Sequence, residues 1–109
     1  MGKLVRDGIP DKIRRNGEEP IVRVLTDEEN LQALIQKLLE ESKEVATADT
    51  RVKMVEELAD LAEVMKALML AKKISTTEVL LIQQLKYDTV GGFDGKLFLE
   101  GVKEKAIAA

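Results

Sequence analysis

The sequence predicts an all-α fold in which a helical hairpin forms a four-helix-bundle-like core when copies associate, with short extended segments near both ends. Two long segments repeat apolar residues at helical spacing. Two helix starts carry a Ser or Thr followed three residues later by Glu, which is a capping signature. The second long segment is apolar around more than half of its circumference, as is typical of a helix covered on two sides.

Length and composition indicate one domain over residues 1–109. A chain of this size buries about 60 to 70% of its unfolded surface, so partner subunits would stabilise it and we expect a homodimer or homotetramer. Hydrophobic residues make up 45% and charged residues 34%, which excludes a disordered chain, and no apolar run is long enough for a membrane span. The net charge of −3 argues against a nucleic-acid-binding surface. Because the first residues are charged and no apolar stretch follows, a cytoplasmic location is expected.

The first elements in chain order are short. Residues 9–16 are expected to form a helix, because Pro10 suits a first helical turn and Asn16-Gly17 is a turn dipeptide. Residues 21–25 alternate apolar and polar side chains and are predicted to form a short strand, with residues 97–99 as its candidate partner.

The first long helix is expected from about residue 27 to residue 46 and begins at a capping box of Thr26 and Glu29. On this helix Glu41 falls at the edge of the apolar stripe, whereas Glu40 points away from it. The stripe consists of Leu31, Leu34, Ile35, Leu38 and Val45.

A second long helix is expected over about residues 51–72, where Glu57 sits against apolar neighbours. A charge in such surroundings is costly unless it is paired or bound to a metal. A third helix is predicted over about residues 75–88, beginning at the second capping signature and ended by Gly91-Gly92.

Four carboxylates form two pairs placed symmetrically about the predicted turn near Asp49. The pairs are Glu41 with Glu44 on the first long helix and Glu57 with Asp60 on the second. Side chains three apart on a helix are neighbours, and in an antiparallel hairpin the two pairs lie at matching heights. The sequence therefore predicts a cage of carboxylates for a hard divalent cation.

All strong ligand candidates are carboxylate oxygens, and the chain has no histidine and no cysteine. This favours Mg²⁺, with Mn²⁺ as a substitute. Mg²⁺ is usually completed by substrate phosphates and water, which indicates a phosphate-bearing substrate. Without histidine, a metal-bound water or a carboxylate with a raised pKa would supply the nucleophile, and Lys or Arg side chains would hold the remaining phosphates.

These features together resemble the MazG-like nucleotide pyrophosphohydrolases of the all-α NTP pyrophosphatase superfamily, which includes phosphoribosyl-ATP pyrophosphohydrolase. The resemblance covers nearly the whole chain and rests on four ordered motifs: residues 3–10, Glu40-Glu41-x-x-Glu44, Glu57-x-x-Asp60 and Gly91-Gly92-Phe93. It implies Mg²⁺-dependent hydrolysis of nucleoside triphosphates, with deoxynucleotides as the expected substrates, to the monophosphate and pyrophosphate. It also implies a house-cleaning role and sites formed between helices of adjacent subunits.

The resemblance also assigns roles to residues. The implied Mg²⁺ ligands and catalytic carboxylates are Glu41, Glu44, Glu57 and Asp60, with Glu40 and Glu56 as secondary candidates for supporting or base roles. The implied phosphate contacts are Lys3, Arg6 and Lys86. Gly8 and Val90 depart from the family pattern, which commonly has lysine and arginine there. Lys12, Arg14 or a neighbouring subunit would have to supply the missing positive charge.

Two other functions compete with hydrolysis. In a non-catalytic interaction or regulatory module, the acidic pairs would only solvate a surface, and neither Mg²⁺ nor nucleotide would bind. A di-iron carboxylate bundle uses Glu-x-x-His pairs, which a chain without histidine cannot form. The base preference stays open, because the aromatic residues available for stacking are only Tyr87, Phe93 and Phe98.

Overall fold

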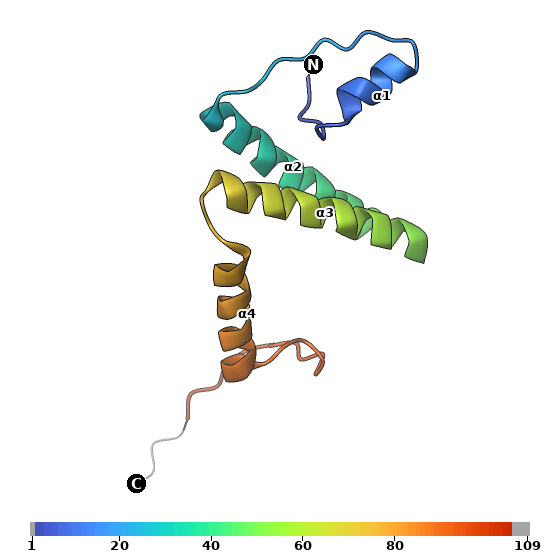
Figure 1. Ribbon diagram of the computed structural model, residues 1–109. Helices are drawn as coiled ribbons and strands as arrows, with labels where there is room; N and C mark the ends of the chain where they lie inside the picture. The colour runs from blue at the N-terminus through green and yellow to red at the C-terminus, as the bar shows by residue number, and fades with distance from the viewer. Residues whose placement is uncertain (1, 106–109) are drawn as a thin grey trace. The chain divides into compact units, whose positions relative to one another are not determined.

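The computed structural model describes residues 2–105, which form four helices and no strand. The helices are α1 (Ile9–Arg15), α2 (Asp27–Thr47), α3 (Arg51–Ala71) and α4 (Thr76–Val90) (Figure 1). The chain divides into two compact units, Met1–Thr76 and Thr77–Ala109. The predicted all-α class is confirmed, whereas assembly of copies into a bundle stays a prediction. Within the described residues, no helix combines the length and the apolar character that a membrane span requires.

The centre of the first unit is the hairpin of α2 and α3, which lie side by side and run in opposite directions (Figure 1). Only a few residues connect them, and so short a connection makes consecutive helices antiparallel neighbours. The chain turns at Ala48, whose backbone is extended, and α3 begins at Thr50, whose hydroxyl accepts a hydrogen bond from the Lys53 amide at 3.1 Å. Within residues 2–105, Leu34 is the one buried hydrophobic side chain, at 5% exposure.

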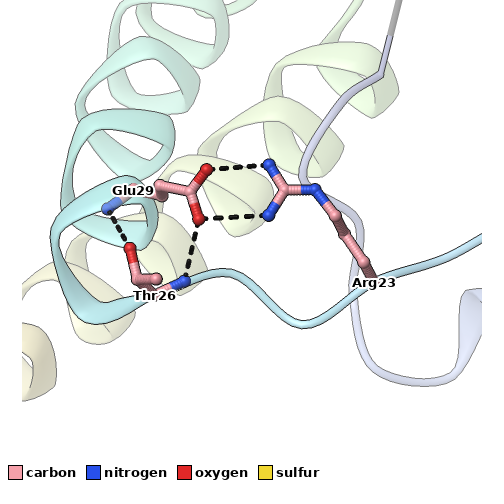
Figure 2. Close-up of polar contacts among 3 residues, drawn as sticks. All are labelled: Arg23, Thr26 and Glu29. Atoms are coloured by element: carbon pink, nitrogen blue, oxygen red, sulfur yellow. Dashed lines mark hydrogen bonds and ion pairs between the residues drawn. The ribbon is translucent and has the colours of Figure 1, made fainter.

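The start of α2 is held by three side chains, shown in Figure 2. The Thr26 hydroxyl accepts a hydrogen bond from the Glu29 amide at 3.2 Å, and the Thr26 amide donates to Glu29 Oε1 at 3.1 Å. Arg23 donates to both oxygens of the Glu29 carboxylate, at 3.1 and 2.8 Å. The predicted capping box is confirmed, and such a cap contributes about 1 kcal/mol to helix stability. Arg23 additionally ties the segment before α2 to the first turn of that helix.

This arrangement predicts that part of the stability depends on pH. The hydrogen bond from Arg23, followed by the Thr26 amide, lowers the pKa of Glu29 from its ordinary 4.5 to about 2. A depressed carboxyl pKa stabilises the folded state while the carboxyl is ionised, so this contribution is present above pH 4.5 and is lost as the pH falls to about 2. We expect Glu29→Gln to lower the melting temperature at neutral pH. We also expect the melting temperature of this variant to decrease less than that of the wild type as the pH is lowered.

Thermal unfolding followed by circular dichroism at several pH values measures this effect. Glu28→Gln is the matched control, because Glu28 lies in the same first turn but makes no side-chain hydrogen bond or ion pair within residues 2–105. If the two variants had the same pH profile, the stabilisation would come from the helix dipole and not from the bond to Arg23.

The predicted strand at residues 21–25 and its partner at residues 97–99 are wrong, because neither segment forms a strand. The alternating side chains do not cover an apolar surface, since Ile21 and Val24 are 101% and 96% exposed. Five alternating residues without a paired backbone do not make a stable strand. The helix ends are predicted better: Gly17 and Gly91 have φ of +86° and +81°, the left-handed conformation that glycine adopts easily where a helix ends.

Candidate functional site

Three carboxylates converge between α2 and α3. Each of Glu41, Glu57 and Asp60 offers an oxygen atom, and these atoms lie within 4.8 Å of one another. All three residues are partly buried. Three negative charges at this spacing repel each other strongly unless a cation or a proton compensates them. An oxygen-only donor set is the one that Mg²⁺ or Mn²⁺ prefers, so the residues present fit the predicted type of cation.

Glu41 is the carboxylate of the cluster whose pKa is raised by its surroundings. Burial raises its pKa above the ordinary value, and the nearby charge of Asp60 raises it further. Lys37 acts in the opposite direction, while Glu57 and Glu44 add smaller increases to the pKa. The pKa of Glu41 is therefore raised first by burial and second by the negative charges around it.

The other predicted carboxylates lie outside this group within the described residues. Glu44 is exposed and acts on Glu41 only through its charge. Glu40 and Glu56 are also exposed and are not members of the cluster. The structure thus brings together one member of the first predicted pair and both members of the second. The ligand role of Glu44 and the supporting roles of Glu40 and Glu56 stay predictions.

Two cationic side chains balance part of the cluster charge. Arg6, in the segment before α1, donates a hydrogen bond from Nη2 to Asp60 Oδ1 at 2.8 Å. Lys53 Nζ lies 4.0 Å from Glu57 Oε1, one helical turn away on α3. Because the side chains of Arg6 and Asp60 are 57% and 45% exposed, their ion pair contributes at most about 1 kcal/mol. Its main effect is to place the N-terminal segment next to the acidic cluster.

A pocket of about 550 Å³ lies between the N-terminal segment and the hairpin. This volume lies within the range typical of small-molecule sites, about 300 to 1,000 Å³. The predicted phosphate contacts Lys3 and Arg6 line it together with Glu41 and Asp60. The other lining residues are Leu4, Val5, Asp7, Ile9, Asn30, Leu34, Lys37, Glu63, Val64 and Ala67. The structure therefore puts cations and carboxylates on the same pocket, although they are far apart in the sequence.

Lys86, the third predicted phosphate contact, lies on α4 in the second unit, and its role stays a prediction. Sequence reasoning in turn missed Asn30, Lys37 and Glu63, which all line the pocket. Lys37 had a usable signal, since it precedes Glu41 by four residues and so shares its helix face.

The chain is similar to a known protein family and to a bacterial protein. Residues 7–85 match the family described as phosphoribosyl-ATP pyrophosphohydrolase. The chain is also 51% identical over 51 residues to an uncharacterized protein of Mycolicibacterium smegmatis, a match that covers 47% of this chain and 52% of that protein. The chain thus spans about half the length of that relative. No solved structure matches the chain.

The matched residues include both acidic motifs, whereas Lys3, Arg6 and the Gly91-Gly92-Phe93 turn lie outside them. The resemblance inferred from the motifs is confirmed, because the match covers well over half of the chain. The chain therefore belongs to the phosphoribosyl-ATP pyrophosphohydrolase family.

Proposed function

We propose that the chain is a Mg²⁺-dependent enzyme that hydrolyses nucleoside triphosphates, deoxynucleotides above all, between the α and β phosphates. The products are the nucleoside monophosphate and pyrophosphate, and the physiological role is house-cleaning of nucleotides in the cytoplasm. The observation that carries this proposal is the convergence of Glu41, Glu57 and Asp60 beside a pocket lined by Lys3 and Arg6. Carboxylates that collect a cation and basic groups that hold phosphates are the two parts such a reaction needs.

The acidic residues would hold the cation. Glu41 from α2 and Glu57 and Asp60 from α3 present their oxygens to one point, and Glu44 is available on the next turn of α2. When bound, Mg²⁺ supplies neutralisation of phosphate charge and a bound water of lowered pKa. Lys3 and Arg6 would bind phosphate oxygens, which the carboxylates repel. Attack of water on the α phosphate would then release pyrophosphate.

The test is to incubate the purified chain with a panel of ribo- and deoxynucleoside triphosphates and Mg²⁺ and to measure pyrophosphate. We expect pyrophosphate and the monophosphate as paired products, with no orthophosphate and no turnover when EDTA removes the metal. Folded protein that released pyrophosphate from no nucleotide would overturn the proposal. If calorimetry then detected binding of neither Mg²⁺ nor nucleotide, the result would support the non-catalytic interaction or regulatory module.

Loss of the Arg6 side chain is expected to strengthen the binding of Mg²⁺ and to weaken the binding of the nucleotide. The Arg6 guanidinium competes with a cation for Asp60, so we expect Arg6→Met to bind Mg²⁺ alone about two- to fivefold more tightly, in line with the loss of an exposed ion pair. The same change removes a phosphate contact, so the KM for the nucleotide should rise. Calorimetry with Mg²⁺ and steady-state kinetics measure the two effects. Arg15→Met on α1 is the control, and a lowered Mg²⁺ affinity in Arg6→Met would contradict the competition.

We also propose that the active form is a homodimer or homotetramer. The hairpin leaves a face of α3 exposed, with Val55, Leu58 and Met65 at 56%, 47% and 43% exposure. These residues recur at helical spacing, which is the pattern of a helix packed on a second surface. A second copy of the chain is the partner that would extend the hairpin to a four-helix core.

A further inference from the structure

The pocket-lining residues of α2 form a single stripe along the helix. They are Asn30, Leu34, Lys37 and Glu41, spaced by four, three and four residues. At a rise of 1.5 Å per residue, the stripe extends about 16 Å along the helix axis. On α3, a second stripe of lining residues runs alongside the first. It consists of Asp60, Glu63, Val64 and Ala67. The pocket is therefore an elongated groove with its acidic cluster at one end and Asn30 at the other.

The chemistry changes in a fixed order along this groove. Beyond Glu41 and Asp60 comes Lys37, with Glu63 and Val64 at about the same height on α3. The apolar side chains of Leu34 and Ala67 follow, and then the side-chain amide of Asn30. A nucleotide has the same order of groups, because charged phosphates precede the sugar and the base. The match holds in only one direction, with the phosphates toward Glu41.

Lys37 suits a phosphate that projects from the acidic end. It is partly buried, and it has no ion-pair partner within residues 2–105, whereas the cluster carboxylates Asp60 and Glu57 already have Arg6 and Lys53 nearby. Its charge reaches Glu41, since it lowers the pKa of that residue. An ammonium group that lines a pocket without an anionic partner offers its hydrogen bonds to an anionic ligand.

Asn30 suits the opposite end of the ligand. It is the one uncharged polar side chain that lines this pocket, and its side-chain amide makes no hydrogen bond to another described residue, whereas its backbone amide donates to the Thr26 carbonyl. A side-chain amide donates and accepts at the same time, which is what the edge of a nucleobase requires. The pocket contains no aromatic side chain, so the faces of the base would rest on aliphatic groups such as Leu34 and Ala67.

We infer that the groove binds its nucleotide lengthwise, with Lys37 on the phosphate that adjoins the nucleoside and Asn30 on the edge of the base. This inference rests on the proposed function and adds the orientation of the substrate and two residues that bind it. Lys37 acts on affinity for the phosphate, and Asn30 acts on the choice of base.

Binding of the product tests Lys37 without any turnover. In calorimetry with deoxynucleoside monophosphates and the matching nucleosides, we expect Lys37→Met to weaken binding of the monophosphate at least about tenfold and to leave the nucleoside unaffected. Lys37→Arg should restore most of the affinity, and Lys43→Met, an exposed lysine of the same helix, should change nothing. An unchanged monophosphate affinity in Lys37→Met would overturn the inference, even if the wild type released pyrophosphate.

Asn30→Leu tests the other end. We expect the wild-type differences in kcat/KM among the four deoxynucleoside triphosphates to shrink to within about threefold, because the hydrogen bonds that distinguish the bases are lost. The monophosphate-to-nucleoside affinity ratio should stay the same. An unaltered order and size of base preference in Asn30→Leu would place the base elsewhere. If the wild type released no pyrophosphate, the proposed function would be overturned instead. The calorimetry with monophosphates and nucleosides would still test the orientation of the bound nucleotide.

Discussion

Glu41→Gln is expected to lower the turnover of nucleoside triphosphates by more than about 100-fold while the protein remains folded. Removal of groups that only support a metal ligand already costs about 10- to 100-fold, and Glu41 is placed to be a ligand itself. The amide keeps the size of the side chain but removes its charge from a crowded cluster. Repulsion with Asp60 and Glu57 therefore falls, and the melting temperature without Mg²⁺ should stay constant or rise.

Single-turnover kinetics and thermal unfolding with and without Mg²⁺ measure both parts of this prediction. The wild type should gain stability when Mg²⁺ is added, by linkage of binding to folding, whereas Glu41→Gln should gain little. Asp49→Asn, in the connection between α2 and α3, is the matched control with the same loss of one acidic charge. Glu40→Gln should reduce turnover less than Glu41→Gln, because Glu40 is exposed and outside the cluster. Full activity in Glu41→Gln would remove it from the set of ligands.

The long helices could be predicted because their signals are local. The capping box at Thr26 and the short connection near Asp49 set the ends of α2 and α3, and the structure agrees with the expected bounds to within one residue. The approach of Glu41 to Asp60 then followed from antiparallel geometry alone. Interactions that depend only on helix spacing and on the direction of the next helix need no knowledge of the rest of the fold.

The parts that sequence reasoning missed depend on how distant segments meet. Nothing near Arg6 in the sequence indicates that its guanidinium bonds to Asp60, 54 residues away. The pocket role of Asn30 likewise appears only once the N-terminal segment lies against the hairpin. The expected strand at residues 21–25 failed for the same reason, because strand formation requires a partner that a local pattern cannot supply.

Met65→Glu is expected to convert the associated form of the chain into a monomer. Met65 shares the exposed face of α3 with Val55 and Leu58, and the described residues contain a single buried hydrophobic side chain, Leu34. If a second copy covers this face, a buried and unpaired carboxylate there would cost several kcal/mol and oppose association. Size-exclusion chromatography with light scattering over a range of concentrations measures the mass of each variant.

The matched control is Arg15→Glu, which introduces the same side chain at an exposed position of α1. It should keep the mass of the wild type although it adds more negative charge. If residues of two copies build each site, loss of pyrophosphate release should accompany dissociation of Met65→Glu and should be absent in Arg15→Glu. A wild type that stays monomeric at every concentration, or a Met65→Glu variant of unchanged mass, would contradict an interface on this face of α3. An interface that passed this test would explain why so short a chain leaves apolar residues of α3 exposed, since they would form the centre of the bundle.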